Sequence, residues 1–406
     1  MSSGLGDFMP FTDRELAYAS FIAFLDLYKG FDFLSEGGPV SIGEILDLLG
    51  KSNIADLSLL EYVSKDDLRA IRSYKLVDYY NDNDFTHSSG FYGCLIELDE
   101  QRIVCALRGS EPMSEIRHRI ADWVFADLML LNSEITIQQK ECENFARQIA
   151  YSKYIHRYTS MAVAGHSLGG NLASHFAIIS YKYGLDDFIE ICANFDGPGF
   201  SNEYLNREEH RRGIERMQER MFNYTWSFIG ALLNPVGEVV YVKANWEGKN
   251  FVTVHRLDNI VLDGDFVAHG KIGKIEQYIG DLSRKVDDAP DSVGNAVFVF
   301  LSVLVLAGYW LVEYMFDNTG ELTVAGYLIV INLLVFLSPY LGMAEAIPIA
   351  LVCILQLQKA LFKEDSTLYK MAERIIFSLG DIFKMPQDYS YNLLSETLRL
   401  GLIANM

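Results

Sequence analysis

The sequence predicts an α/β protein with a mostly parallel sheet covered by helices on both faces. Strand-like apolar runs alternate with segments of helical periodicity, which is the pattern of such sheets. One short apolar run, Met161–Ala164, leads directly into a glycine-containing turn and then a helix-forming segment. Half of the 406 residues are apolar and 13% are aromatic, so the chain can bury a large core.

The first part of the chain is expected to be helical and the next part to contain strands. Apolar positions recur at helical spacing between Thr12 and Leu76, and Asp13 can cap the first helix. Residues 1–80 are therefore interpreted as a helical N-terminal part of the catalytic unit. Two strands are then predicted at Gly90–Leu98 and Arg102–Arg108, separated by a turn.

The middle of the chain continues the alternation and completes a predicted catalytic core over residues 81–286. A heavily charged helix near its centre is expected to be a solvated surface helix. The predicted elements are, in order, a helix at 133–151, a strand at 161–164, helices at 171–183 and 204–220, and strands at 190–195, 239–242 and 251–254.

Residues 287–406 are predicted to form a hydrophobic helical C-terminal region. Residues 293–312 and 322–344 contain no charged side chain, and about 20 apolar residues suffice to cross a bilayer as a helix. This pattern favours a transmembrane hairpin; a pair of long core helices or an apolar lid are the alternatives. Basic residues flank the pair while the connecting loop holds only acidic ones, which predicts that both ends are cytoplasmic.

The composition also indicates where the chain works and what it does not bind. A net charge of −20 disfavours nucleic acid, whose binding depends on basic side chains. The N-terminus lacks a basic region followed by an apolar run, so no cleavable secretory signal is expected. Five scattered cysteines without metal-ligand spacing predict buried, inert thiols and no disulfide framework.

Gly165-His-Ser-Leu-Gly169 is the motif that carries chemistry. A nucleophile elbow requires a strand, a sharp turn and a helix, so that the serine oxygen stands exposed at the helix N-terminus. Met161–Ala164 supplies the strand, the glycines permit the tight turn, and Asn171–Ala177 begins the helix. The context predicts a nucleophile elbow with Ser167 as the nucleophile; the alternative is a tight turn in which this serine is only a cap.

Three further segments resemble a known family. Ala164-Gly-His-Ser-Leu-Gly-Gly-Asn-Leu-Ala, together with Ala106-Leu-Arg-Gly-Ser-Glu and Asp122-Trp-Val-Phe-Ala-Asp-Leu, resembles the class 3 lipases. The resemblance is closer to uncharacterised bacterial lipase-like hydrolases, in which a segment like Asp196-Gly-Pro-Gly-Phe follows the next strand. It covers roughly residues 11–285 and implies the α/β-hydrolase fold with esterase chemistry.

The general base is predicted to be His255. In this fold the triad residues follow the order serine, acid, histidine, which excludes histidines before Ser167. His210 lies in the charged helix, and His166 and His175 are too close to the elbow in sequence to point correctly. His255 follows a predicted strand and matches the place of the histidine in the resembling family, whereas His269 is the weaker alternative.

The acid that orients the base is predicted to be Asp196, with Asp258 as the alternative. Asp196 ends the strand after the nucleophile helix, so it opens at the same sheet edge as Ser167. Class 3 lipases place their acid one strand later, but here that segment, from Asn223 to Gly230, has no carboxylate. Asp258 lies three residues beyond His255, in a position where an aspartate commonly forms a turn.

An oxyanion hole needs two backbone N–H donors. The residue after the nucleophile, Leu168, supplies one. Ser110 is the expected second donor, because the resembling lipases use an Arg-Gly-Thr segment where this chain has Arg108-Gly-Ser110. Arg108 itself is expected to pair with a carboxylate such as Asp122 or Asp127.

The sequence therefore predicts a serine carboxylester hydrolase, facing the cytoplasm and attached to a membrane, that acts on lipid or acyl esters without a cofactor or metal. The same triad would serve a thioesterase, an acyltransferase or a peptidase. A non-catalytic membrane interaction protein on a hydrolase scaffold is the reading from another class.

Overall fold

The computed structural model describes most of the first 288 residues. The described ranges are 10–35, 38–52, 57, 60, 63–83, 88–108, 136–246 and 253–288. The predicted C-terminal region, with its hairpin at 293–312 and 322–344, lies outside them.

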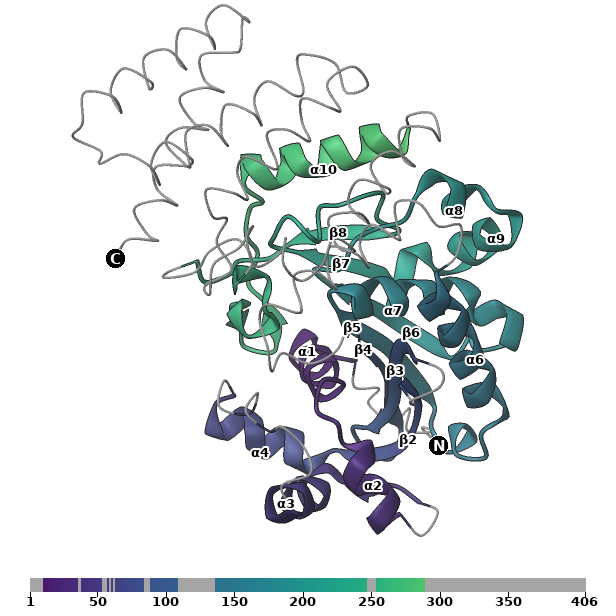
Figure 1. Ribbon diagram of the computed structural model, residues 1–406, viewed down its shortest axis with the longest axis vertical. Helices are drawn as coiled ribbons and strands as arrows, with labels where there is room; N and C mark the ends of the chain where they lie inside the picture. Colours follow the sequence, from purple (N-terminus) through teal and green to yellow (C-terminus); the bar gives the residue numbers. More distant parts are fainter. Residues whose placement is uncertain are drawn as a thin grey trace, which may run out of the picture.

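A single sheet of eight strands forms the centre of the described structure (Figure 1). Its strands lie side by side in chain order, antiparallel from β1 to β4 and parallel from β4 to β8. The strands are β1 (Val40–Ser41), β2 (Lys75–Asn83), β3 (Ser88–Glu97), β4 (Arg102–Arg108), β5 (Ser160–His166), β6 (Ile189–Phe195), β7 (Met221–Thr225) and β8 (Glu238–Tyr241). The predicted α/β class with a mostly parallel sheet is confirmed.

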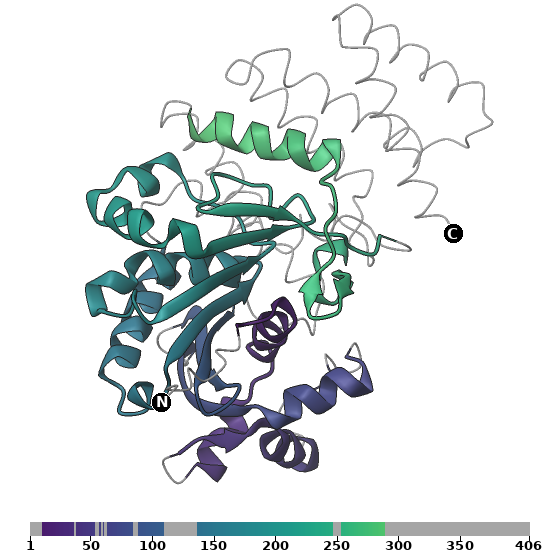
Figure 2. The ribbon, with the colours of Figure 1, turned by 180° about the vertical axis from the view of Figure 1, so that it is seen from behind.

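One face of the sheet is covered by the helices that connect its parallel strands. They are α6 (Ile137–Tyr151), α7 (Leu168–Ile179), α8 (Asn202–Asn206) and α9 (Glu208–Met217). They lie on the same side of the sheet in both views (Figures 1 and 2). Successive right-handed crossovers in one direction place every connecting helix on one face. Because strand residues alternate, Met161 and Val163 of β5 pack into this helical layer.

The other face of the sheet is covered by α1 (Asp13–Ile22), beside which lie α2 (Tyr28–Leu34), α3 (Ile42–Ser52) and α4 (Lys65–Ser73). Thr12, not Asp13, caps α1 and forms a capping box with Glu15. Asp13 is buried instead, where it accepts hydrogen bonds from the Tyr224 hydroxyl at 2.5 Å and the Val267 N–H at 2.9 Å. These two bonds join α1 to the sheet and to the hairpin of β9 (Leu262–Asp263) and β10 (Phe266–Val267).

Two predictions about secondary structure are corrected. The expected helical part stops before β2, whose Lys75–Asn83 run pairs with β3 instead of continuing a helix. Thr253 and Val254 do not belong to a strand, because Thr253–His255 is a single 3-10 turn. A β-branched run such as Val252-Thr-Val254 mimics a strand locally, but the Val254 carbonyl accepts its hydrogen bond from the Trp226 side chain at 2.9 Å.

The last described helix, α10 (Lys274–Asp287), packs across the β8 end of the sheet (Figure 1). Ser283 accepts a hydrogen bond from the Leu233 N–H at 2.8 Å, and Arg284 donates to the carbonyls of Ala231 and Leu233. Among the residues that the structure describes, none of the helices is both long and apolar enough to cross a membrane.

Candidate active site

The turn between β5 and α7 has the backbone of a nucleophile elbow. Ser167 has φ 60° and ψ −134°, which a residue with a side chain rarely adopts. Its N–H donates to the Phe195 carbonyl at 2.9 Å, and its carbonyl accepts the Gly170 N–H at 2.8 Å. The strained serine is thereby held between the ends of β5 and β6 and the first turn of α7.

Two glycines allow this turn to close. A Cβ at Gly165 would lie 2.1 Å from the Gly169 carbonyl oxygen, and one at Gly170 would lie 2.0 Å from Asn194 Oδ1. Neither position therefore accepts a side chain without displacing its neighbours. The same Asn194 oxygen accepts the Gly197 N–H at 2.8 Å, which ties the elbow to the turn that follows β6.

Asp196 begins that second turn and also has a positive φ, of 53°. Its own N–H donates to the Tyr224 carbonyl at 2.7 Å. Its Oδ1 accepts the N–H groups of Trp226 at 2.9 Å and of Ser227 at 3.0 Å. The side chain is 0% exposed, so these donors replace the water that the carboxylate lacks.

The other oxygen of Asp196 binds the imidazole of His255, which is also buried. His255 Nδ1 lies 2.7 Å from Asp196 Oδ2 and 3.3 Å from the Ser227 hydroxyl. Burial alone would raise the pKa of Asp196, but the hydrogen bonds from His255, Ser227 and Trp226 lower it below its ordinary value. An ionised carboxylate only accepts hydrogen bonds, so His255 Nδ1 carries the proton of this bond, which is the tautomer in which Nε2 faces away from the acid.

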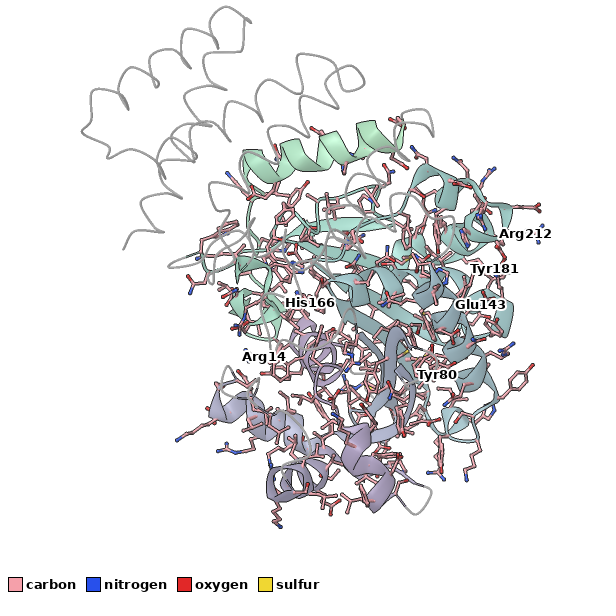
Figure 3. The ribbon with its side chains drawn as sticks, in the orientation of Figure 1. Arg14, Tyr80, Glu143, His166, Tyr181 and Arg212 are labelled. Carbon is pink, nitrogen blue, oxygen red and sulfur yellow. The ribbon has the colours of Figure 1, made fainter. Side chains whose placement is uncertain are left out.

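His166, the residue before the nucleophile, contacts the base directly. Its Nε2 lies 2.8 Å from the His255 carbonyl oxygen, and the two ring centroids are 4.7 Å apart. Figure 3 shows His166 inside the molecule, above α1, whereas Arg212 lies at the periphery. Burial, and after it the charge on His255, lower the pKa of His166 to about 3, so this side chain is neutral at physiological pH.

The structure thus joins Asp196 and His255 directly, and it ties Ser167 to them through the backbone. Ser167 is bonded through its backbone to the residue before Asp196, and Asp196 is bonded to His255. Of the alternatives, Asp258 instead pairs with Arg256 at 2.8 Å, and His269 is exposed in a bridge to Val242.

Of the two predicted oxyanion donors, only one can be placed. Leu168 is the first residue of α7, where backbone N–H groups have no partner within the helix. Ser110 lies outside the described residues. So do Asp122 and Asp127, and the described partner of the buried Arg108 is Asp26, at 2.9 Å.

Sequence reasoning missed the residues that hold the acid and the base. The segment after Asn223, set aside because it has no carboxylate, supplies the Trp226 and Ser227 N–H groups that bind Asp196. The signal in the sequence is the position of this segment, which follows the next strand after Asp196 and therefore opens at the same edge of the sheet. His166 is not the predicted base, and nothing in its sequence position indicates that it contacts the His255 carbonyl.

Within the described residues, no group of three or more His, Cys, Asp or Glu side chains is arranged to hold a metal ion. Four of the five cysteines, Cys94, Cys105, Cys142 and Cys192, are described, and all four are buried free thiols.

An elbow with this backbone, set in a mostly parallel sheet, defines a lipase-like α/β protein. The chain matches the family model described as Mbeg1-like over residues 67–279, just over half of its length. It therefore belongs to the Mbeg1-like family. The predicted likeness to lipases is confirmed at this level, while the closer resemblance to bacterial hydrolases stays a prediction.

The crystal structure of M37 lipase is similar with 13% sequence identity and a TM-score of 0.30, covering 74% of this chain and 100% of that one. No curated protein matches the chain.

Proposed function

We propose that the protein is a serine carboxylester hydrolase that acts on lipid or acyl esters through Ser167, His255 and Asp196. The observation that carries the proposal is the buried Asp196–His255 pair, joined through the backbone of β5 and β6 to a serine at positive φ. Structural ion pairs also occur in cores, but a buried acid–imidazole pair at an elbow serine is the arrangement that activates a nucleophile.

In the proposed reaction the Ser167 hydroxyl attacks the ester carbonyl and its proton passes to His255 Nε2. Asp196 stabilises the imidazolium that forms, and the Leu168 N–H binds the developing oxyanion, with Ser110 as the proposed second donor. The imidazolium then protonates the leaving alkoxide. Water, deprotonated by His255, releases the acid from the acyl-enzyme and restores the serine.

Covalent labelling by a fluorophosphonate probe tests this assignment. The native chain should be labelled at one serine, identified by peptide mass spectrometry as Ser167. Ser167→Ala should abolish labelling, and His255→Ala should slow it by roughly 10⁴-fold, because the serine then lacks its base.

Matched controls come from the same helix and from the alternative base. Ser174→Ala changes a buried serine in α7, about two helix turns beyond Ser167. His269→Ala removes the exposed histidine that is the alternative base. Both variants should be labelled at the native rate. A folded native chain that is not labelled would contradict the proposed hydrolase and favour the alternative hypothesis, in which the protein binds partners without catalysis. Labelled protein that cleaves thioesters or peptides faster than oxyesters would replace the substrate class and keep the triad.

We further propose that residues 293–312 and 322–344 attach the enzyme to a membrane, with the catalytic part in the cytoplasm. The support is the uncharged length of both segments and the basic residues that flank them. Membrane fractionation of the full chain, beside a chain ending at Asp287, tests this. Equal recovery of both in the soluble fraction would contradict it.

A further inference from the structure

Two consecutive carbonyl groups on the segment that carries the base accept hydrogen bonds from aromatic side chains. Trp226 Nε1 donates to the Val254 carbonyl at 2.9 Å, and His166 Nε2 contacts the His255 carbonyl at 2.8 Å. A carbonyl oxygen only accepts, so the proton of the neutral His166 ring is on Nε2. Both donors are buried, where such bonds are stronger than in water.

These two bonds fix the backbone near His255, whereas the sheet fixes the backbone of Ser167 and Asp196. Ser167 and Asp196 directly follow strands β5 and β6, and backbone hydrogen bonds fix both. His255 ends a single 3-10 turn outside the eight-stranded sheet. Side-chain hydrogen bonds to the Val254 and His255 carbonyls therefore help to fix the position of this turn, and small displacements of a catalytic group are costly.

The His166 ring is itself held in place. It stacks on Trp226 with ring centroids 6.0 Å apart and an interplanar angle of 11°, and it meets the edge of Phe24 at 6.0 Å. Its backbone belongs to β5, beside the β6 residue Phe195. His166, one residue before the nucleophile, is thus a rigid hydrogen-bond donor to the backbone of His255.

We propose that His166 is a positioning residue that holds the backbone of His255, so that the imidazole stays aligned between Asp196 and Ser167. The inference rests on the proposed function, since alignment matters only if His255 is the base. A neutral ring in this position also avoids repulsion when His255 becomes protonated during the reaction.

Three substitutions separate the donor from the volume of the ring. His166→Phe keeps an aromatic ring and removes the donor. His166→Gln places an amide N–H at about the reach of Nε2, whereas His166→Asn presents an amide one methylene shorter, which does not reach the His255 carbonyl. We expect the first-order rate of fluorophosphonate labelling to fall by roughly 10² in the Phe and Asn variants and to stay within about threefold in the Gln variant. The half-saturating probe concentration should not change.

A proton NMR signal gives a readout that loss of stability does not imitate. The His255 Nδ1 proton bonded to Asp196 should resonate far downfield in the native chain, disappear in His255→Ala, survive in His166→Gln and broaden in His166→Phe. His175→Phe, which removes another buried neutral histidine, should leave both the resonance and the labelling rate unchanged.

Each outcome separates this inference from the proposed function. Failure of the native chain to label at Ser167 overturns the proposed function and the inference with it. A native chain that labels, together with a folded His166→Phe chain that labels equally fast, overturns only the inference. If His166→Phe does not fold, the Gln and Asn variants decide, and equal labelling rates for these two reject the positioning role.

Discussion

The two faces of the sheet each bury a pair of histidines, and the pairs have different partners. On the α1 face, His166 and His255 lie 4.7 Å apart, and His255 is bonded to a carboxylate. On the α7 face, His175 and His210 lie 6.0 Å apart around Tyr204. Burial, followed by the charge of the neighbouring histidine, lowers the pKa of both His166 and His175 to about 3.

The partners decide which pair is suited to chemistry. His175 Nε2 meets the Gln139 carbonyl at 3.1 Å and must donate to it, so Nδ1 accepts the Tyr204 hydroxyl at 2.5 Å. Both ring nitrogens are occupied by neutral groups, and within the described part of the chain no carboxylate hydrogen-bonds to the ring. His255 has the same burial but a bonded Asp196, which can stabilise a positive charge. This difference in partners supports the proposal that His255, and not His175, is the base.

The largest expected effect comes from removing that carboxylate charge. Asp196→Asn keeps the size of the side chain but no longer fixes the Nδ1–H tautomer or stabilises the imidazolium. We expect the rate of fluorophosphonate labelling to fall by roughly 10⁴-fold. Asp258→Asn is the control, since Asp258 pairs with Arg256 and not with the base, and it should label at the native rate. If the two substitutions slowed labelling equally, the carboxylate bonded to His255 would not explain why the α1 face, and not the α7 face, is suited to catalysis.

The fold was largely predictable because its signals are local. Each parallel strand from Arg102 to Phe195 is a short apolar run, and the turn at Gly165 is dictated by glycine and serine geometry. Beyond the two corrected elements, one failure is tertiary. His210 was placed on a solvated helix, yet it is fully buried against Tyr204 because α9 packs its inner side against α7.

The candidate site was predictable as far as chain order reached. The elbow, the strand ends, the order serine, acid, histidine and the family resemblance together predict Ser167, Asp196 and His255, and of these the structure hydrogen-bonds Asp196 to His255. The donors that hold them could not be predicted, because the Trp226 and Ser227 N–H groups bind a carboxylate 30 and 31 residues earlier in the chain. Backbone donors have no residue-type signature, so only the fold reveals them.

The second prediction concerns stability at mildly acidic pH, to which both faces contribute. His166 and His175 have a folded pKa of about 3 against roughly 6.5 in an unfolded chain, so the unfolded state binds more protons below pH 6.5. Stability is therefore fully present above that pH and is lost as pH falls toward 3. At pH 5 the loss is about 2 kcal/mol for each histidine, or roughly 4 kcal/mol together. Asp196, whose pKa is lowered, stabilises the fold above about pH 4, and that stabilisation is lost only as the pH falls below this value.

Urea unfolding at pH 7.5 and pH 5, followed by tryptophan fluorescence, measures this loss. The free energy of unfolding of His175→Phe should depend on pH less steeply than that of the native chain, because unfolding of the variant takes up about one proton fewer. A native chain equally stable at the two pH values would show that these histidines are not buried as neutral groups.

The smallest expected effect tests whether the α7 face is purely structural. His175→Phe leaves the Tyr204 hydroxyl and the Gln139 carbonyl without this partner, which should lower the free energy of unfolding at pH 7.5 by about 1–3 kcal/mol. Tyr204→Phe breaks the same bond from the other side and keeps the ring that stacks on Phe200 and His210. The double variant should be less destabilised than the sum of the single ones, by about 1 kcal/mol, because no buried partner of that bond is then left unpaired.

All three chains should be labelled by fluorophosphonate within about twofold of the native rate, since an effect through stability alone does not change the folded site. A tenfold loss of labelling in folded His175→Phe would instead connect this face to catalysis, and the contrast between neutral and carboxylate partners would no longer explain which histidine acts as the base.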